Sequence, residues 1–428
     1  MNILSIIEKK KLGKKLTSNE IQFFVDGVVN GKIKDYQTTS LLMAICLNDI
    51  DFDETYNLTM SMAKSGEMVD LTDVGDCFDK HSTGGVSDTT TLVIVPILAS
   101  LGVKVAKMSG RSLGFTGGTA DKMEVFKGYK TEIDTAKFKE LIKKNNASIV
   151  SPSEDIAIAD KIIYKLRSES GTVENIGLIA SSIMSKKIAC GAQTIMLDCK
   201  YGSGAFMKTL ADCKKLANVM ALIGKRAGLK VIAVISNMNQ PLSNFIGNNF
   251  EVYSAIKVLS GEENNLAKLS KFLCANALII QGKAKNVNEA NVLVESAIKT
   301  GKAKEMLKKI VSAQGGDTSI IDSPERLLPT NSKIEICADV DGYVESMDTS
   351  LLGNLSHLIQ YENGTYKRQD DAGIVLNKNI GDYVKRGELL LTIYYNHLDD
   401  ESDIISLAKK VIQIGKKVEY NLVDEIIS

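Results

Sequence analysis

Tryptophan is absent from this chain of 428 residues, which also holds only five prolines and three histidines. Net charge is absent too, because 52 lysines and arginines balance 52 aspartates and glutamates. A neutral chain lacks the broad positive field that attracts nucleic acid or an anionic membrane, so neither partner is expected. No run of about 18 apolar residues occurs, which leaves no candidate for a membrane-spanning helix.

No secretory leader is expected either, since MNILSIIEKKKLGKK places a very short apolar run before its charges. The seven cysteines include no C-x-x-C pair and no Cys–His set at zinc-ligand spacing. Buried, reduced thiols are therefore favoured, and they predict a cytoplasmic protein. What the chain does contain is 44% hydrophobic residues, enough for a large core in roughly two or three domains.

Three regions differ in their hydrophobic pattern. Residues 1–66 show helical periodicity and 156–190 is helical again, so the two segments are expected to form one small helical domain. Apolar runs alternate with helical stretches in 67–155 and 191–330, which predicts a larger α/β domain with a largely parallel sheet. After a proline-containing linker, residues 335–428 alternate apolar and polar residues around Gly-Asp turns, which predicts a β-rich α+β domain.

The first candidate site is the segment DKHSTGGVSDTTT, which starts at Asp79. Gly84 and Gly85 let successive backbone N–H groups turn toward one point, and Ser82 and Lys80 add further donors. A helix is expected to follow, so its positive dipole end would add to the field, and we expect this segment to bind phosphate. The spacing is neither that of a P-loop nor that of a dinucleotide fingerprint. The alternative is an ordinary Gly-Thr turn.

The second candidate is SGRSLGFTGGTADKME, which starts at Ser109 directly after the apolar run VKVAKM. It therefore lies at the carboxyl end of a predicted strand, where ligands of open α/β sheets bind. Its glycines and hydroxyls are expected to hold the same phosphate from the other side. The alternative is that Arg111 pairs with Asp121 and braces the loops, a contact that we expect of Arg111 in either case.

A third set is cationic. Arg167 is accompanied by Lys186 and by Ser182, which lies four residues before Lys186 and hence on the same helix face. Taken alone, this pattern is more typical of solvated surface charge. Among the histidines, His81 lies inside the first candidate loop, where a purely structural role is less natural.

Together these segments resemble the thymidine and pyrimidine-nucleoside phosphorylases, over the whole length of the chain. SGRSLGFTGGTADKMEVF is similar to that family's signature S-G-R-G-L-G-H-T-G-G-T-x-D-K-L-E, and DKHSTGGVSDTTT resembles its phosphate loop. FMKTL and NMNQPLSN also fall where family segments belong, and VAKMSGR is closest to the bacterial pyrimidine-nucleoside enzymes. The resemblance implies a helical domain, an α/β domain and a C-terminal domain, with a homodimer contact through the helical domains.

The resemblance further implies phosphorolysis of pyrimidine nucleosides, with inorganic phosphate as co-substrate and no required cofactor. Arg167, Ser182 and Lys186 would hold the pyrimidine ring. His81 would approach the 2-oxo group of the ring, and His81, Arg167 and Lys186 would be the catalytic residues. The residues implied in phosphate binding are Lys80, Ser82, Gly84, Gly85, Thr91, Lys107, Ser109 and Thr119.

Several positions depart from the family pattern. Ser87 and Ser112 stand at glycine positions, Phe115 stands at a histidine position, and Ser168 and Ser243 are also unusual. A side chain at a glycine position strains the backbone wherever φ is positive. None of these departures removes a charged group of the candidate site, so we expect activity with an altered rate or substrate range.

Some members of the family bind a monovalent cation. In this chain the resemblance places that potassium site at Ser87, Thr89 and Leu242. One carboxylate of the site falls at Ser254, which leaves the presence of potassium open.

Three alternatives stay open. A nucleoside-monophosphate phosphorylase would be expected to carry an extra N-terminal domain, and an anthranilate phosphoribosyltransferase would need an acidic pair for magnesium pyrophosphate that we do not find. The third is a non-catalytic nucleoside-binding paralogue. The glycine substitutions favour it, whereas retention of Lys80, His81, Arg167 and Lys186 argues against it.

Overall fold

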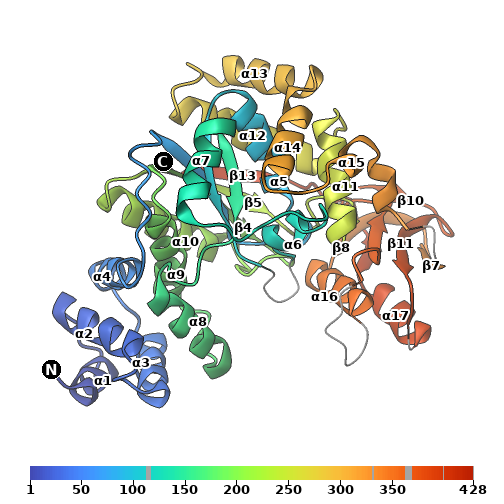
Figure 1. Ribbon diagram of the computed structural model, residues 1–428. Coiled ribbons are helices and arrows are strands. Elements are labelled where there is room, and N and C mark those ends of the chain that lie inside the picture. Colours follow the sequence, from blue (N-terminus) through green and yellow to red (C-terminus); the bar gives the residue numbers. More distant parts are fainter. Residues whose placement is uncertain (112–116, 330–331, 362–368, 399, 428) are drawn as a thin grey trace.

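The computed structural model describes residues 1–111, 117–329, 332–361, 369–398 and 400–427. These residues fold as a helical unit, a central α/β unit and a C-terminal unit that contains two small sheets (Figure 1). No helix in the described part of the chain is both long and apolar enough to cross a bilayer.

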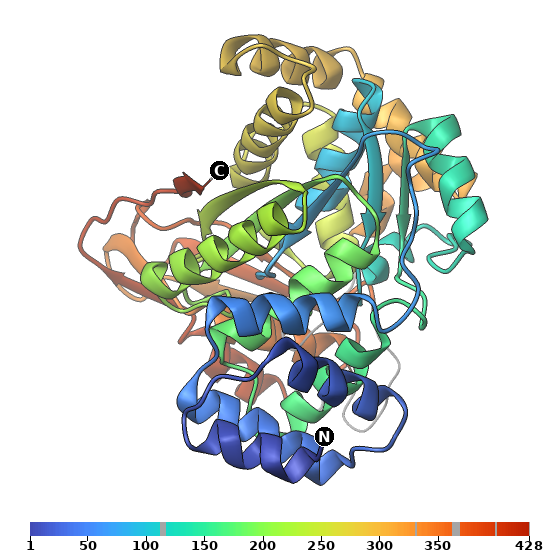
Figure 2. The same cartoon turned by 90° about the vertical axis from the view of Figure 1, so that its left-hand side faces the viewer.

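The helical unit joins two segments that are far apart in the sequence. Its helices are α1 (Ile3–Lys11), α2 (Ser18–Val29), α3 (Asp35–Asn48), α4 (Phe52–Ala63), α8 (Ile158–Ser170) and α9 (Ile176–Ala189). Capping boxes start α2 at Thr17 with Glu20 and α4 at Asp51 with Glu54. Apolar side chains of α1 to α4 share one core with Ile163 of α8, and Figure 2 shows the blue and green helices side by side.

The α/β unit is built on a six-stranded sheet in the order β13-β5-β4-β1-β2-β3. Its strands are β1 (Cys77–Ser82), β2 (Lys104–Met108), β3 (Ala147–Val150), β4 (Thr194–Tyr201), β5 (Lys230–Asn237) and β13 (Val423–Ile427). All neighbours pair in parallel except β13, which runs antiparallel to β5. The carboxyl ends of β1, β2 and β4 therefore meet at one edge, where ligands of such sheets bind.

Helices cover both faces of this sheet with apolar cores. The connecting elements are α5 (Thr90–Ser100), α6 (Thr119–Met123), α7 (Thr135–Asn145), α10 (Leu210–Arg226), α11 (Asn248–Leu259), α12 (Asn265–Ile280), α13 (Val287–Lys299), α14 (Lys302–Ala313), α15 (Ser319–Asp322) and the 3-10 turn Pro324–Leu327. α5, α11, α12, α13 and α14 form a core on one face, and α9 and α10 form a core on the other. α9 thus belongs to the helical unit and also packs on the sheet.

The C-terminal unit and the α/β unit each contribute one strand to a sheet of the other. Its elements are β7 (Ser332–Cys337), β8 (Gly342–Met347), α16 (Thr349–Gln360), β9 (Gly373–Leu376), β10 (Tyr383–Val384), β11 (Leu389–Tyr395), α17 (Glu401–Ala408) and β12 (Ile412–Gly415). Strand β6 (Phe245–Ile246) of the α/β unit pairs with β9, and β13 returns to the central sheet. The last residues of the expected C-terminal domain, 335–428, therefore belong to the central sheet in the structure. There β13 covers the otherwise unpaired edge of β5.

Candidate active site

Strand β1 carries the first candidate loop to the carboxyl edge of the sheet. Lys80, His81 and Ser82 are its last three residues. The chain then turns at Gly84, whose φ of +93° favours glycine, and the Gly84 N–H donates to Ser82 Oγ over 3.1 Å. A Cβ atom at Gly85 would lie 2.6 Å from Cε of Met238, so a side chain there would displace the end of that methionine. The loop leads directly into α5.

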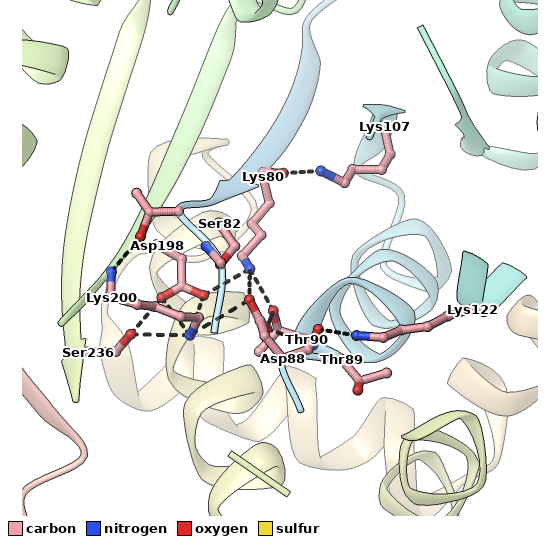
Figure 3. Close-up of polar contacts among 12 residues, drawn as sticks. Lys80, Ser82, Asp88, Thr89, Thr90, Lys107, Lys122, Asp198, Lys200 and Ser236 are labelled. Atoms are coloured by element: carbon pink, nitrogen blue, oxygen red, sulfur yellow. Dashed lines mark hydrogen bonds and ion pairs between the residues drawn. The ribbon is translucent and has the colours of Figure 1, made fainter. Parts of the chain in front are cut away.

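A buried network of charged side chains lies beneath this loop (Figure 3). Lys80 Nζ lies 2.8 Å from Asp198 Oδ2 and donates to Thr90 Oγ1 over 2.6 Å. Lys200 Nζ lies 3.0 Å from the same Asp198 oxygen, and both ammonium groups lie 3.9 Å from Asp88 Oδ2. Burial alone would raise the pKa of Asp88, but the two lysines lower it far below its usual range. The loop is therefore anchored at Asp88 by two fixed cations.

Sequence reasoning missed Asp198 and Lys200, which complete this network. They lie in the second half of strand β4, and the parallel register sets Asp198 opposite Ser82 of β1. Ser236 of β5 donates its hydroxyl hydrogen to Asp198 Oδ1 over 2.8 Å. The available signal was the triplet DCK at the end of the run TIML, because charged residues at the end of a buried strand need partners.

The second candidate loop follows β2. Ser109 comes directly after the strand and its N–H donates to the Val150 carbonyl over 2.9 Å. Thr119 is the first residue of α6, and Thr91, at 6% exposed, lies in the first turn of α5. Ser112 and Phe115, the two substituted signature positions, lie outside the described residues.

Arg111 braces this second loop, as expected. Its guanidinium makes two hydrogen bonds to the Glu124 carboxylate, of 2.9 and 2.7 Å, and a third of 3.3 Å to Asp121 Oδ1. Asp121 Oδ2 also accepts from the Gly118 N–H at the start of α6. Arg111 therefore ties the loop to α6 and to Glu124, the residue that follows this helix.

Two lysines share one buried aspartate between the two loops. Lys187 Nζ of α9 lies 2.6 Å from Asp79 Oδ2 and donates to the Met108 carbonyl over 2.9 Å. Lys107 Nζ of β2 lies 3.7 Å from Asp79 Oδ1 and donates to the Lys80 carbonyl. Burial and the charge of Lys187 lower the pKa of Lys107 to about 7. Sequence reasoning also missed Lys187 as a site residue, because nothing in the segment SKK distinguishes its second lysine from its first.

His81 is neutral in this environment. Its Nε2 is enclosed and has no hydrogen-bond partner among the described residues. Burial is the main cause that lowers the pKa of His81 well below 6.5, and the charges of Lys187, Lys107, Lys80 and Lys186 lower it further. The charge of Lys186 thus reaches His81, although the two residues come from different clusters of the sequence. The lowered pKa makes the imidazole a neutral group and not an imidazolium.

Lys186 and Ser182 lie on one face of α9, as their spacing predicts. Lys186 Nζ donates to Ser182 Oγ over 3.0 Å and pairs with the Asp160 carboxylate of α8. The same ammonium lies 5.8 Å from the centre of the Tyr164 ring. Its side chain is 36% exposed, so Lys186 is held in place by its partners and is still partly open to solvent.

Arg167 makes structural hydrogen bonds that the sequence did not predict. Its Nε, Nη1 and Nη2 atoms donate to the backbone carbonyls of Thr172, Leu178 and Val173, over 3.1, 3.1 and 2.6 Å. Burial lowers the pKa of this guanidinium. Arg167 therefore fixes the connection between α8 and α9, the helices that carry Asp160 and Lys186.

The three residues proposed for potassium lie beside the first loop. Ser87 Oγ donates to the Phe245 carbonyl over 2.8 Å, and Thr89 Oγ1 donates to Glu251 Oε2 over 3.0 Å. Leu242 is buried, and its N–H lies 3.4 Å from the Val86 carbonyl. No cluster of three or more His, Cys, Asp or Glu side chains suited to a metal occurs in the described ranges.

Comparison with known domains gives the class of protein. Residues 4–66 match "Glycosyl transferase family, helical bundle domain", and residues 74–304 match "Glycosyl transferase family, a/b domain". Anthranilate phosphoribosyltransferase from Thermus thermophilus shares the fold, with a TM-score of 0.60 over 72% of this chain and 98% of its own, at 18% sequence identity. The fold and the site together define a glycosyl transferase of this helical-bundle and α/β class.

The remaining comparisons narrow the class. Residues 343–415 match "Pyrimidine nucleoside phosphorylase C-terminal domain". Pyrimidine-nucleoside phosphorylases of Staphylococcus aureus strains COL and NCTC 8325 are each 46% identical over 434 residues, which cover 100% of this chain and 100% of theirs. The chain therefore belongs to the pyrimidine-nucleoside phosphorylase family. The family and the fold class expected from the sequence are confirmed.

Proposed function

We propose that this enzyme splits pyrimidine nucleosides such as uridine, thymidine and deoxyuridine with inorganic phosphate. The products are the free base and ribose 1-phosphate or deoxyribose 1-phosphate. The observation that carries the proposal is the buried lysine surplus beside neutral His81, at the meeting point of two glycine-containing loops. The names of the full-length relatives support the same reaction.

The reaction balances without a cofactor. An oxygen of hydrogen phosphate forms a bond to C1′ of the sugar while the bond from C1′ to the base nitrogen breaks. The electron pair of that bond leaves with the base, and the proton of hydrogen phosphate ends on the base. The sugar is cation-like in the transition state, so the phosphate is both the nucleophile and a compensating negative charge.

The charges of the site match those of the reaction. We assign the phosphate to the two loops, where the lysines Lys80 and Lys107 lie beside hydroxyl and backbone donors. We assign the base to Lys186 and Ser182, with neutral His81 donating a hydrogen bond to it. Donors held in place before the reaction stabilise developing charge by a few kcal/mol each, because they need no reorganisation.

The test is release of free base from a nucleoside panel. Uracil or thymine should appear only when phosphate is present, together with one equivalent of sugar 1-phosphate. Base release that does not need phosphate would indicate a hydrolase. Binding of nucleoside without turnover would indicate the non-catalytic alternative, and preference for 5′-monophosphates would indicate the nucleoside-monophosphate alternative.

We also propose that the enzyme is a homodimer through its helical unit. Tyr36, Met43 and Leu47 project from one face of α3 and are 70%, 40% and 77% exposed. Leu4 and Leu12, at the two ends of the neighbouring helix α1, are 58% and 66% exposed. An apolar area of this kind on adjacent helices supports an interface between two copies of the chain.

Light scattering tests the dimer. Leu47→Asp should give monomers at micromolar concentration, whereas Leu222→Asp should not, because Leu222 is an exposed leucine of α10 in the other unit. A wild-type monomer would refute the proposal. We place the enzyme in the cytoplasm, which the seven unpaired cysteines support.

A further inference from the structure

A chain of buried hydroxyl groups connects the phosphate loop to helix α11. Ser87 Oγ donates to the Phe245 carbonyl over 2.8 Å, and the Phe245 N–H donates to Ser243 Oγ over 3.1 Å. Ser243 Oγ then donates to Ser254 Oγ of α11 over 2.7 Å. The three serines are 2%, 0% and 0% exposed, so these bonds do not compete with bulk water.

Ser87 adopts an unfavourable backbone conformation to make this contact. Its φ of +58° lies in the left-handed region, which residues with a Cβ atom avoid. Such outliers persist only where the surrounding contacts hold them, and they gather at functional sites. The hydrogen bond from Ser87 Oγ supplies a contact that glycine could not make.

A fixed ammonium group lies next to this chain of hydroxyls. Lys122 Nζ of α6 lies 2.6 Å from Glu251 Oε2 of α11 and donates to the Asp88 carbonyl over 2.9 Å. Thr89 donates to the same oxygen of Glu251 over 3.0 Å. The carboxylate that α11 brings to the loop is therefore already neutralised by a lysine.

A monovalent cation does not fit this arrangement. A hard cation needs several oxygen lone pairs directed at one point, and a carboxylate strengthens its binding. Here the Phe245 carbonyl accepts from Ser87, and the hydroxyl of Thr89 is engaged with Glu251. Ser254 supplies a neutral hydroxyl where the family site has a carboxylate. Two oxygen atoms beside the loop are thus already in hydrogen bonds, the Phe245 carbonyl as an acceptor and the Thr89 hydroxyl as a donor, and the carboxylate of Glu251 is paired with Lys122.

We propose that Ser87, Ser243 and Ser254, together with the Lys122–Glu251 pair, form a cation-free brace that holds the phosphate loop against α11. Phosphate binding and folding in this chain are consequently independent of potassium. Ser87 acts as a positioning residue, because it fixes the loop and does not touch the reacting atoms. The link to phosphate rests on the proposed function, whereas independence from potassium does not.

Thermal unfolding tests the cation without any turnover. The melting temperature should agree within about 1 °C in about 100 mM KCl, NaCl and choline chloride at equal ionic strength. A cation bound with a Kd near 1 mM would raise it by several degrees at that concentration. A rise in KCl that is absent in NaCl and choline chloride would overturn the proposal, whether or not the protein has the proposed activity.

Steady-state kinetics test the positioning role. Ser87→Ala and Ser87→Gly should raise KM for phosphate by about two- to tenfold, the effect of losing one hydrogen bond, with KM for the nucleoside changed less than about twofold. Ser87→Gly relieves the backbone strain, so it keeps the test valid if Ser87→Ala folds poorly. Ser270→Ala is the matched control, because Ser270 is a buried serine of α12 whose hydroxyl has no partner among the described residues. If Ser87→Gly behaves like Ser270→Ala, the brace has no positioning role.

Discussion

Binding of a dianion beside Lys107 is expected to place a proton on that lysine. Burial, together with the charge of Lys187, lowers the pKa of Lys107 to about 7. Asp79 compensates only in part, because its carboxylate lies 2.6 Å from Lys187 and 3.7 Å from Lys107. A bound dianion would supply the missing negative charge and raise the pKa of Lys107 toward the ordinary 10.5.

The size of the effect follows from the two pKa values. At pH 8 a group with a pKa of about 7 is roughly one-tenth protonated, whereas the same group with a pKa near 10.5 is almost fully protonated. Binding at pH 8 should therefore take up about 0.9 proton per site at Lys107.

Calorimetric titration with sulfate measures this uptake. Sulfate is a dianion that does not itself titrate near pH 8, so the difference in heat between two buffers of unlike ionisation enthalpy reports protons bound by the protein. Lys107→Met should abolish the uptake. Lys104→Met, at the other end of the same strand, should leave it unchanged. Uptake below about 0.2 proton in the wild type, or equal uptake in Lys107→Met, would refute the reasoning.

Lys107 also makes one contribution of known sign to the pH dependence of the free energy of unfolding. Between pH 7 and 10.5 the folded protein binds fewer protons at Lys107 than the unfolded chain does, because burial depresses the folded-state pKa. The contribution of Lys107 to the free energy of unfolding therefore falls as the pH drops through that window. Bound sulfate should weaken this dependence.

Three further predictions concern the base side of the site. Lys186→Ala should lower kcat at least about a hundredfold in the phosphorolysis assay, whereas Lys161→Ala on the exposed face of α8 should change it less than twofold. The pKa of His81 is lowered by burial and by Lys187, so one of three histidine resonances, absent in His81→Gln, should not titrate by NMR near pH 6.5. Arg167→Lys should lower the free energy of unfolding in urea by about 2–4 kcal/mol, because one ammonium cannot replace a guanidinium bonded to three carbonyls.

Local sequence was enough to locate both loops. Gly84 and Gly85 precede a helix, and Ser109 follows an apolar run, so the turns and their position at strand ends follow from neighbours in the chain. The partners that complete the network could not be found in this way. Asp198 meets Lys80 because β4 pairs in parallel with β1 at one particular register, and the register is a property of the whole sheet.

The role of Arg167 shows a second limit of sequence reasoning. Residue type alone leaves its role open, because a guanidinium suits either a pyrimidine ring or a set of carbonyl oxygens. The three carbonyls that surround Arg167 become visible only once the chain between α8 and α9 has been traced in the fold. Likewise, the five residues of β13 pair with the otherwise unpaired edge of β5. The sequence around Val423 does not show which strand edge is free.

The balance of buried charge supports the proposal that the site binds an anion. Four lysines and three aspartates lie at the carboxyl ends of β1, β2 and β4 or on the elements that face them, and 4 − 3 leaves one positive charge in excess when all seven groups are ionised. Neutral His81 adds nothing to that sum, and the pKa of Lys107 is lowered first by burial and then by the neighbouring positive charge. A dianion relieves this excess, whereas a potassium ion beside Asp88 would add to it. The same surplus therefore favours binding of phosphate and, together with the hydroxyl brace, disfavours a metal cation at the loop. The members of the set are Lys80, Lys107, Lys187, Lys200, Asp79, Asp88 and Asp198.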